Sequence, residues 1–308
     1  MTVSVCMGIY NGENYIEEQL RCILHQTKTV DEVILCDDNS SDHTVSVVRA
    51  FVEKHSLEGS WKLYCNQENK GYPANYYDAM GLCSGDIVFL ADQDDIWAET
   101  KVERMMSVLE ADSRVSLLAC RFGLIDGAGK DIKAVMEPSH STGSGERKAV
   151  HLHDVFYRYE WPGMVLAYRN AWYRNWVKTI GEIPHDIFLC AKAAEEGRFL
   201  ELDETLAWHR RHENNTAAEE HRIRKLLNKG RKFWEIEKYL KMLEQFEQCE
   251  VFQTEEGRRT LQEKLTAMRS RYAALQSGKI RRVLQSAWEN RRNVRLATVV
   301  CDVLIVKT

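Results

Sequence analysis

The first third of the chain alternates between short apolar runs and longer segments in which apolar residues recur every three or four positions. The apolar runs predict strands at residues 3–7, 32–36, 61–65 and 86–91, and the periodic segments predict helices at 14–25, after Asp42, and at 74–83. Strands that alternate with crossover helices pack as a sheet with helices on both faces. The pattern therefore predicts an α/β fold with a doubly wound, mostly parallel sheet.

The alternation of apolar runs and periodic segments becomes less regular after residue 115. The composition changes again near residue 217, beyond which proline is absent and charged residues dominate. We expect one domain at residues 1–216 and a C-terminal helical appendage at 217–308. The appendage has two stripes of apolar residues at helical spacing, which predict a hairpin with a packed seam. The stripes are Phe233, Ile236, Leu240 and Leu243, and then Leu261, Leu265, Met268, Tyr272 and Leu275.

The composition narrows the possible partners and the compartment. The net charge is −4 and apolar residues make up 44% of the chain, which is ordinary for a globular protein but not for one that binds nucleic acid. Nine cysteines occur without C-x-x-C spacing, and Cys6, Cys36 and Cys120 lie in apolar runs. With no leader pattern at the start of the chain, we expect a reducing, cytoplasmic location.

Three carboxylates follow the fourth expected strand, where residues 92–95 read Asp-Gln-Asp-Asp. Burying anionic groups this close together is costly unless a cation neutralises them. Mg²⁺ or Mn²⁺ with oxygen ligands and substrate phosphates would fit Asp92 and Asp94. A solvated acidic turn that caps the next helix explains the same residues equally well.

Asp37 and Asp38 end the second expected strand, so they share with Asp92 the carboxyl edge at which such sheets bind ligands. Either carboxylate could accept hydrogen bonds from a nucleotide base or ribose. Taken alone, the segment is better explained as a turn followed by a helix cap.

Two later segments carry further candidate chemistry. Asp186 stands beside an apolar run, so it is a candidate general base, although it could equally cap a helix. Residues 208–215 combine His209 and His212 with two arginines. His212 could ligate a metal, but a basic surface loop is the simpler explanation.

Taken together and in order, these segments resemble the family 2 glycosyltransferases, which have the glycosyltransferase A fold, and in particular their rhamnosyltransferase-like branch. The resemblance covers roughly residues 3 to 216. The segments that carry it are 5–16, Leu-His-Gln-Thr at 24–27, Asp-Asp-Asn-Ser-Ser-Asp at 37–42, Asn-Lys-Gly-Tyr-Pro-Ala-Asn at 69–75, Asp-Gln-Asp-Asp at 92–95, His-Asp at 185–186, and His-Arg-Arg-His-x-Asn-Asn at 209–215.

The resemblance implies a role for each matching residue. Asp186 would be the catalytic base, Asp92, Asp94 and His212 would contact a Mn²⁺ or Mg²⁺ ion, and Asp92 would also face the ribose. The residues of the donor site would be Tyr10, Asp37, Asp38, Lys70, Asn75 and Asp92. Residues 161–168 depart from the family's usual Gly-Cys-Thr-Met-Ala-Phe pattern, which bears on acceptor recognition.

The implied activity is inverting transfer of a hexosyl or rhamnosyl group from a dTDP- or UDP-linked donor to a saccharide or lipid-linked acceptor. Bacterial surface polysaccharide would be the product. Two other functions remain open. A nucleotidyltransferase would need a basic glycine-rich loop after its first strand, which residues 8–14 lack, and a catalytically silent scaffold would not need Asp94 or Asp186.

The end of the chain allows two interpretations. Basic clusters at residues 225–232, 279–282 and 291–295 accompany an apolar run at 297–306. Such residues can hold a protein on an anionic membrane, here the inner face of the plasma membrane. The run is short and contains Asp302, so we favour the second interpretation, in which Val299, Val300, Val303 and Leu304 complete the core of the helical region.

Overall fold

We describe a computed structural model of the chain, which covers residues 1–132, 142–158, 160–176, 182–211 and 228–307. The chain divides into two compact units. Unit 1 comprises Met1–His151, Glu160–Lys178 and Pro184–His212. Unit 2 comprises Leu152–Tyr159, Thr179–Ile183 and Glu213–Thr308.

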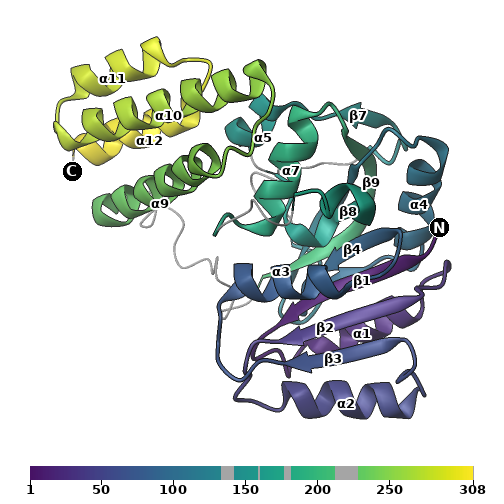
Figure 1. The fold of residues 1–308 in the computed structure, drawn as a ribbon. Helices are drawn as coiled ribbons and strands as arrows, with labels where there is room; N and C mark the ends of the chain where they lie inside the picture. The colour runs from purple at the N-terminus through teal and green to yellow at the C-terminus, as the bar shows by residue number, and fades with distance from the viewer. Residues whose placement is uncertain (133–141, 159, 177–181, 212–227, 308) are drawn as a thin grey trace. The chain divides into compact units, whose positions relative to one another are not determined.

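Unit 1 is built on a sheet of nine strands within the described residues, in the order β3-β2-β1-β4-β8-β6-β9-β5, with β7 paired to β9 (Figure 1). The first four strands in this order are parallel, and the rest form a mixed sheet. The strands are β1 Val3–Ile9, β2 Glu32–Asp37, β3 Trp61–Cys65, β4 Ile87–Ala91, β5 Ile96–Trp97, β6 Leu117–Asp126, β7 Arg147–Ala149, β8 Leu166–Arg169 and β9 Phe199–Arg211.

The helices of unit 1 lie on both faces of the sheet. Strands β1, β2 and β3 follow one another in one direction, and β4 returns to the other side of β1. Because such crossovers are right-handed, α3 must cover the face opposite to α1 and α2, as Figure 1 shows. The helices are α1 Ile16–Leu24, α2 Thr44–Lys54, α3 Tyr72–Leu82, α4 Lys101–Ala111, α6 Asn170–Tyr173 and α7 His185–Glu195, with a 3₁₀ turn at Gly163–Val165.

The prediction of a doubly wound α/β fold with a helical C-terminal region is confirmed. Strands β1 and β4 are buried along almost their whole length, which is why each reads as an unbroken apolar run. Helix α3 begins earlier than its apolar spacing suggested. Gly71 takes a left-handed φ of 83° just before it, and Pro73 stands in its first turn, where no donor is needed.

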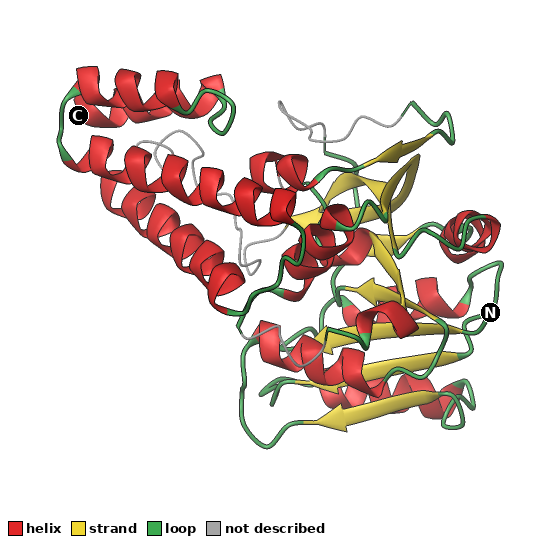
Figure 2. Cartoon of the chain, turned by 45° about the horizontal axis from the view of Figure 1, so that its top comes forward, coloured by secondary structure: helices red, strands yellow, loops and turns green. Residues whose placement is uncertain are grey.

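Unit 2 is helical in its described residues (Figure 2). Helix α10 packs on α9 and α11, and α11 packs on α12. Both predicted stripes contribute to the seam, with Ile236, Leu243, Leu261 and Leu265 buried. The helices are α5 Leu152–Arg158, α9 Lys229–Gln248, α10 Glu255–Gln276, α11 Ile280–Glu289 and α12 Leu296–Lys307.

Two observations bear on whether the end of the chain contacts a membrane. The expectation that Val300 and Leu304 complete its core is wrong, because these side chains are 53% and 43% exposed, whereas Asp302 and Ile305 are buried. Across the described parts of the chain, we find no helix with the length and apolar character needed to cross a bilayer.

Candidate active site

The acidic segments predicted from the sequence meet at one edge of the sheet. Strand β1 pairs in parallel with β2 on one side and β4 on the other, with Ile9 opposite Asp37 and Met7 opposite Ala91. The segments that follow these three strands are therefore neighbours. The backbone N–H of Asp38 donates to the carbonyl of Ile9 at 2.8 Å.

Asp37 and Asp38 are both buried, and the carboxylate of each accepts hydrogen bonds from backbone N–H groups of a neighbouring loop. Asp37 accepts from the N–H and hydroxyl of Ser40, which forms the turn into α2. Asp38 accepts from the N–H groups of Lys70 and Gly71, each at 2.9 Å, and from the side-chain amide of Asn66 at 3.0 Å. The Asp38 carboxylate thus closes the 66–71 loop over the end of β2.

The other predicted donor-site residues lie around this loop. The Asn75 amide bridges the sheet and the loop, since it donates to the carbonyl of Cys36 and accepts from Asn66. Lys70 extends its ammonium into solvent, where it pairs with Asp78 at 2.6 Å. Tyr10 follows β1 with an exposed ring, and its backbone N–H and carbonyl are held by the Gln93 amide. These contacts tie the 66–71 loop to the end of β2, and the segment after β1 to the segment after β4.

Asp92 follows β4 and accepts a hydrogen bond from the hydroxyl of Tyr76. Burial raises the pKa of its carboxyl to about 7, and the negative charges of Asp95 and Asp94 act in the same direction. Tyr76 comes from α3, so one hydrogen bond joins this helix to the end of β4. The raised pKa of Asp92 reflects first its burial and then the negative charge of its acidic neighbours.

We expect the free energy of unfolding to fall as pH rises from about 4 to about 7 when no divalent cation is present. The Asp92 carboxyl has a pKa near 3.8 when unfolded and about 7 when folded, so the folded state binds the additional proton in this window. Urea denaturation across a pH series measures the slope, and Asp92→Asn should reduce it, because burial also raises the pKa of Asp95 and that carboxyl contributes in the same direction.

Asp112→Asn is the matched control for this pH series. Hydrogen bonds from Arg114 lower the pKa of the Asp112 carboxyl to about 2, so it does not titrate in the same window. Its variant should keep the wild-type slope. A flat wild-type profile would show that Asp92 remains ionised in the folded protein.

Asp95 lies deeper than its two neighbours and is held from β9. Its Oδ1 accepts from the backbone N–H of Arg210 at 3.0 Å and lies 3.1 Å from Nδ1 of His209. Its Oδ2 is buried without a hydrogen-bond partner among the described residues. The short β5–β9 pairing, Ile96 with Trp208, creates this contact. Sequence reasoning grouped His209 with His212, whereas the fold pairs His209 with Asp95.

The acidic residues fit a divalent cation in charge and in donor type. Asp92 has a raised pKa and Asp95 has an unpartnered buried oxygen, and each feature would be relieved by a cation beside residues 92–95. The described residues contain no cluster of three His, Cys, Asp or Glu side chains with the geometry of a complete metal site. Mg²⁺ commonly uses one or two carboxylates and completes its shell with water and substrate phosphates. His212, the third predicted ligand, lies outside the described residues.

Asp186 stands in the first turn of α7, where its Oδ1 accepts from the N–H of Ile187 at 2.8 Å. The N-cap of this helix is Pro184, so Asp186 is not the capping residue itself. A carboxylate in the first turn is stabilised by the helix dipole. Its side chain is only partly buried, so it stays accessible to a ligand.

Sequence reasoning included His185 in the His-Asp segment but gave it no role of its own, and the structure buries it among aromatic rings. Its imidazole stacks on Tyr76 at 4.0 Å between ring centroids, and Tyr72 and Tyr77 approach it edge-on. Burial lowers the pKa of His185, so the ring is neutral near pH 7. The continuous contact from His185 through Tyr76 to Asp92 connects the α7 segment with the acidic segment after β4.

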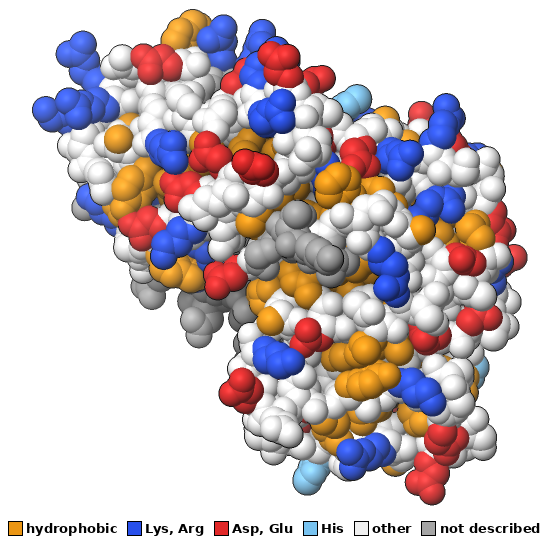
Figure 3. Space-filling model, in the orientation of Figure 1, with side chains coloured by type: hydrophobic (Ala, Val, Ile, Leu, Met, Phe, Trp, Pro, Cys, Tyr) orange, Lys and Arg blue, Asp and Glu red, His pale blue; other side chains and the backbone are white. Residues whose placement is uncertain are grey.

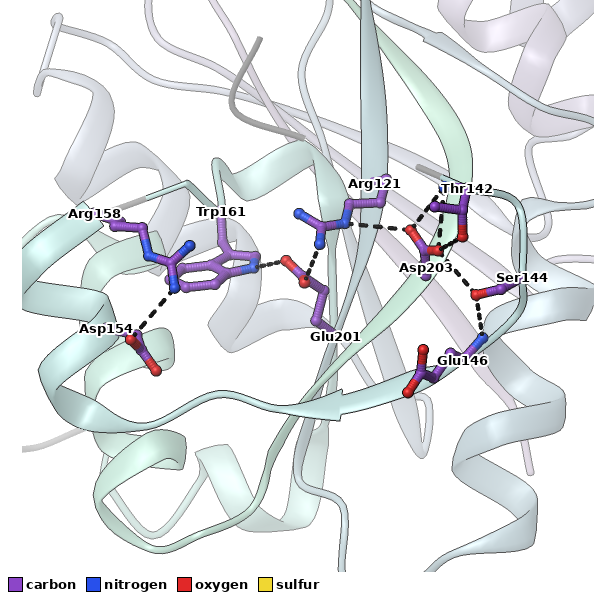
Figure 4. A network of polar contacts seen from close by, with 9 residues as sticks. All are labelled: Arg121, Thr142, Ser144, Glu146, Asp154, Arg158, Trp161, Glu201 and Asp203. Atoms are coloured by element: carbon purple, nitrogen blue, oxygen red, sulfur yellow. Dashed lines mark hydrogen bonds and ion pairs between the residues drawn. The ribbon is translucent and has the colours of Figure 1, made fainter. Parts of the chain in front are cut away.

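The Trp161 segment, in which the sequence departs from the family pattern, is anchored by a buried polar network (Figure 4). The Trp161 indole N–H donates to Glu201 at 2.6 Å, and the Arg121 guanidinium pairs with the other oxygen of Glu201 at 2.7 Å. Gly163 follows, and a β-carbon there would lie 3.0 Å from Nε2 of His185. Glu201 therefore holds the segment that packs against the imidazole.

Glu201→Gln is expected to lower the free energy of unfolding by about 2 kcal/mol, because it leaves the largely buried Arg121 without its closest anion. Glu204→Gln on the same strand is the matched control. Its partner Arg104 is half-exposed, so the loss should be below about 1 kcal/mol. Urea denaturation of both variants measures the difference. Equal losses would mean that burial of the Glu201 pair has no energetic consequence.

Comparison with known proteins is consistent with this geometry. Residues 4–158, just over half of the chain, match the model of glycosyl transferase family 2. EpsE of Bacillus subtilis (strain 168) is 34% identical over 108 residues, 35% of this chain and 38% of EpsE. The UDP-Glc:α-D-GlcNAc-diphosphoundecaprenol β-1,3-glucosyltransferase WfgD of Escherichia coli is 34% identical over 107 residues, 35% of this chain and 40% of WfgD. The match thus spans less than half of either relative.

Solved structures share the fold over nearly the whole chain. The crystal structure of S. aureus TarS 1–349 in complex with UDP has a TM-score of 0.59 and 18% identity, and the match covers 94% of this chain and 92% of that one. The mannosyltransferase PcManGT from Pyrobaculum calidifontis, in complex with GDP-Man and Mn²⁺, has a TM-score of 0.54 and 18% identity. This match covers 99% of this chain and 85% of that one. At these identities the likeness establishes the fold alone.

Proposed function

This chain belongs to glycosyl transferase family 2, and we propose that it moves a hexosyl or rhamnosyl group from a nucleoside-diphosphate donor to a hydroxyl acceptor, with inversion. The observation that carries the proposal is the convergence of Asp38 and Asp92 at one sheet edge, with the Asp186 segment joined to Asp92 through His185 and Tyr76. This arrangement offers a nucleotide site, an acidic phosphate site and a general base on connected elements.

We assign the nucleotide to the loops after β1, β2 and β3 and to the start of α3. Asp38 fixes the 66–71 loop, and Asn75 ties that loop to the sheet, so both would shape the base and ribose site. Tyr10 presents an exposed ring beside them, suited to stacking on a base. Lys70 could exchange its partner Asp78 for a phosphate. TarS was crystallised with UDP and with UDP-GlcNAc, which supports a UDP- or dTDP-linked donor.

We assign the diphosphate to the acidic segment after β4. A divalent cation held there by Asp92 and Asp94 would neutralise charge on the departing nucleoside diphosphate. His212 would be a further contact from the segment after β9. The Mn²⁺ in the PcManGT structure supports this assignment, as does the Asp95 oxygen that finds no hydrogen-bond partner in the described part of the chain. Asp95 itself is engaged by His209 and Arg210, so it would support this segment from behind.

Asp186 would act as the general base of the transfer. Its carboxylate would accept the proton of the acceptor hydroxyl while the oxygen attacks the anomeric carbon from the face opposite to the leaving group. A single displacement of this kind inverts the configuration. Because the diphosphate departs without protonation once its charge is neutralised, one carboxylate base suffices, in contrast to the two carboxyl groups of glycosidases.

The acceptor we favour is a lipid-linked saccharide of bacterial surface polysaccharide synthesis. WfgD, whose name specifies a diphosphoundecaprenol-linked acceptor, supports this choice. The nine cysteines are free, which fits a reducing compartment such as the cytoplasm.

A panel of nucleotide sugars with and without Mn²⁺ tests the proposal. We expect metal-dependent release of nucleoside diphosphate from one donor, increased by a lipid-linked acceptor. Release of pyrophosphate from a nucleoside triphosphate and a sugar phosphate would instead identify a nucleotidyltransferase. Absence of nucleotide binding by calorimetry across the panel would favour a catalytically silent scaffold.

A further inference from the structure

Helices α11 and α12 expose large apolar side chains. On α11, Leu284 and Trp288 are four residues apart and therefore share a face. On α12, Leu296, Val300 and Leu304 recur at every fourth position. Trp288 is 73% exposed and Leu296 is 80% exposed. We call these five residues the exposed apolar set.

The inner faces of the same helices are packed and their polar groups are paired. Ser286 of α11 lies within hydrogen-bond distance of Ser270, at 2.8 Å. Asp302 of α12 is buried and accepts two hydrogen bonds from Arg271, at 2.6 and 2.8 Å. Asp302 was the sequence feature that argued against membrane binding. In the structure its side chain faces inward and its charge is neutralised by Arg271. The solvent face of α12 carries apolar residues without an acidic one.

The charge of this region differs in sign from that of the chain. Residues 279–308 contain seven Lys and Arg residues and two acidic ones, a net charge of +5, whereas the whole chain carries −4. Arg281, Arg282, Arg291 and Arg292 are exposed, and Arg291 lies over the Trp288 ring at 5.3 Å. Figure 3 shows basic side chains projecting from the part of unit 2 that carries α11.

We propose that the exposed apolar set and these arginines bind the surface of a bilayer that contains anionic phospholipid. Tryptophan and arginine are the side chains suited to the headgroup region, and leucine and valine to the acyl boundary below it. Helix α12 has 12 residues, a length of about 18 Å, so it lies along the surface instead of crossing a core of about 30 Å.

The charge distribution distinguishes this partner from two others. A second copy would bring the exposed arginines of residues 279–308, a segment of net charge +5, against the same arginines, so like-charge repulsion opposes a symmetric dimer at this face. A nucleic acid would attract the arginines but would leave Leu296, Val300 and Leu304 in water. An anionic bilayer satisfies both the apolar and the basic residues. The inference goes beyond the proposed sugar transfer and does not depend on it.

Flotation of the full chain with lipid vesicles tests the proposal without any nucleotide sugar, so its outcome is independent of the transfer assay. The protein should float with vesicles of phosphatidylcholine and phosphatidylglycerol, and should remain in the bottom fraction with phosphatidylcholine alone. Salt should reduce flotation because it screens the arginines. If the wild type never floats with the anionic vesicles, the proposal is overturned.

Paired variants locate the surface. Trp288→Ser with Leu296→Ser should lower the lipid partition coefficient by about tenfold or more, and so should Arg291→Gln with Arg292→Gln, because each near-surface charge changes affinity by about fivefold. The matched control is Trp234→Ser with Arg231→Gln on α9, which changes another exposed Trp of the same unit, 58% exposed, and should float as the wild type does. Circular dichroism confirms that each variant is folded. Equal loss in the control pair would overturn the assignment to α11 and α12.

Two further results would assign the surface to another partner and overturn the proposal. The first is wild-type binding to a fluorescent RNA duplex without flotation on anionic vesicles. The second is a dimer in sedimentation equilibrium that Trp288→Ser with Leu296→Ser dissociates while flotation stays unchanged.

Discussion

Asp94→Ala is expected to lower the rate of sugar transfer by at least about a thousandfold while the protein stays folded. Neutralising charge on a departing diphosphate supplies several kcal/mol to the transition state, and each 1.36 kcal/mol is a factor of ten in rate. The Asp94 side chain is not part of the buried core, so its removal should cost little stability. Single-turnover release of nucleoside diphosphate at saturating Mn²⁺ measures the effect.

Glu99→Ala is the matched control for Asp94→Ala. Glu99 is an exposed acidic side chain five residues further along the chain, so its variant also removes one negative charge from a nearby position in the sequence. It should retain wild-type turnover. Full activity of the Asp94 variant, or of the wild type in excess chelator, would remove Asp94 from the proposed diphosphate site.

Asp186→Asn is expected to reduce turnover by about 10²–10⁴-fold, the usual contribution of a positioned general base. Asparagine has nearly the same shape and can still accept from the N–H of Ile187, so α7 should keep its first turn. The lost interaction with the helix dipole should cost about 0.3–1 kcal/mol of stability. Steady-state kinetics with saturating donor and acceptor measures the loss of turnover.

Nucleotide binding separates a base from a donor-site residue. The proposed donor contacts come from the segments after β1, β2, β3 and β4 and from α3, whereas Asp186 comes from α7. Calorimetry should therefore give wild-type affinity for the nucleoside diphosphate in the Asp186→Asn variant. A collapse of that affinity would place Asp186 in the donor site, and unchanged turnover would exclude it as the base.

The sequence by itself determined the parallel half of the sheet and the location of its acidic edge. Strands such as β1 and β4 are buried on both faces, so they appear as unbroken apolar runs that need no long-range information to recognise. Strand ends are local features too, which is why Asp37, Asp38 and Asp92 could be assigned to one edge. The stripes of α9 and α10 were predictable for the same reason, because helical periodicity is local.

Only the tertiary structure decided which side chains face one another across distant segments. The pairing of β5 with β9 joins Asp95 to His209 over more than a hundred residues, and a two-residue strand leaves no periodic signal. The stacking of His185 on Tyr76 depends on how α7 meets α3. Helix α12 is apolar on nearly every side, so its sequence does not show which face is buried; Asp302 is turned inward, where it pairs with Arg271 of α10, and Leu304 is exposed. Composition and spacing describe what a segment can bury, whereas its partner determines which face it does bury.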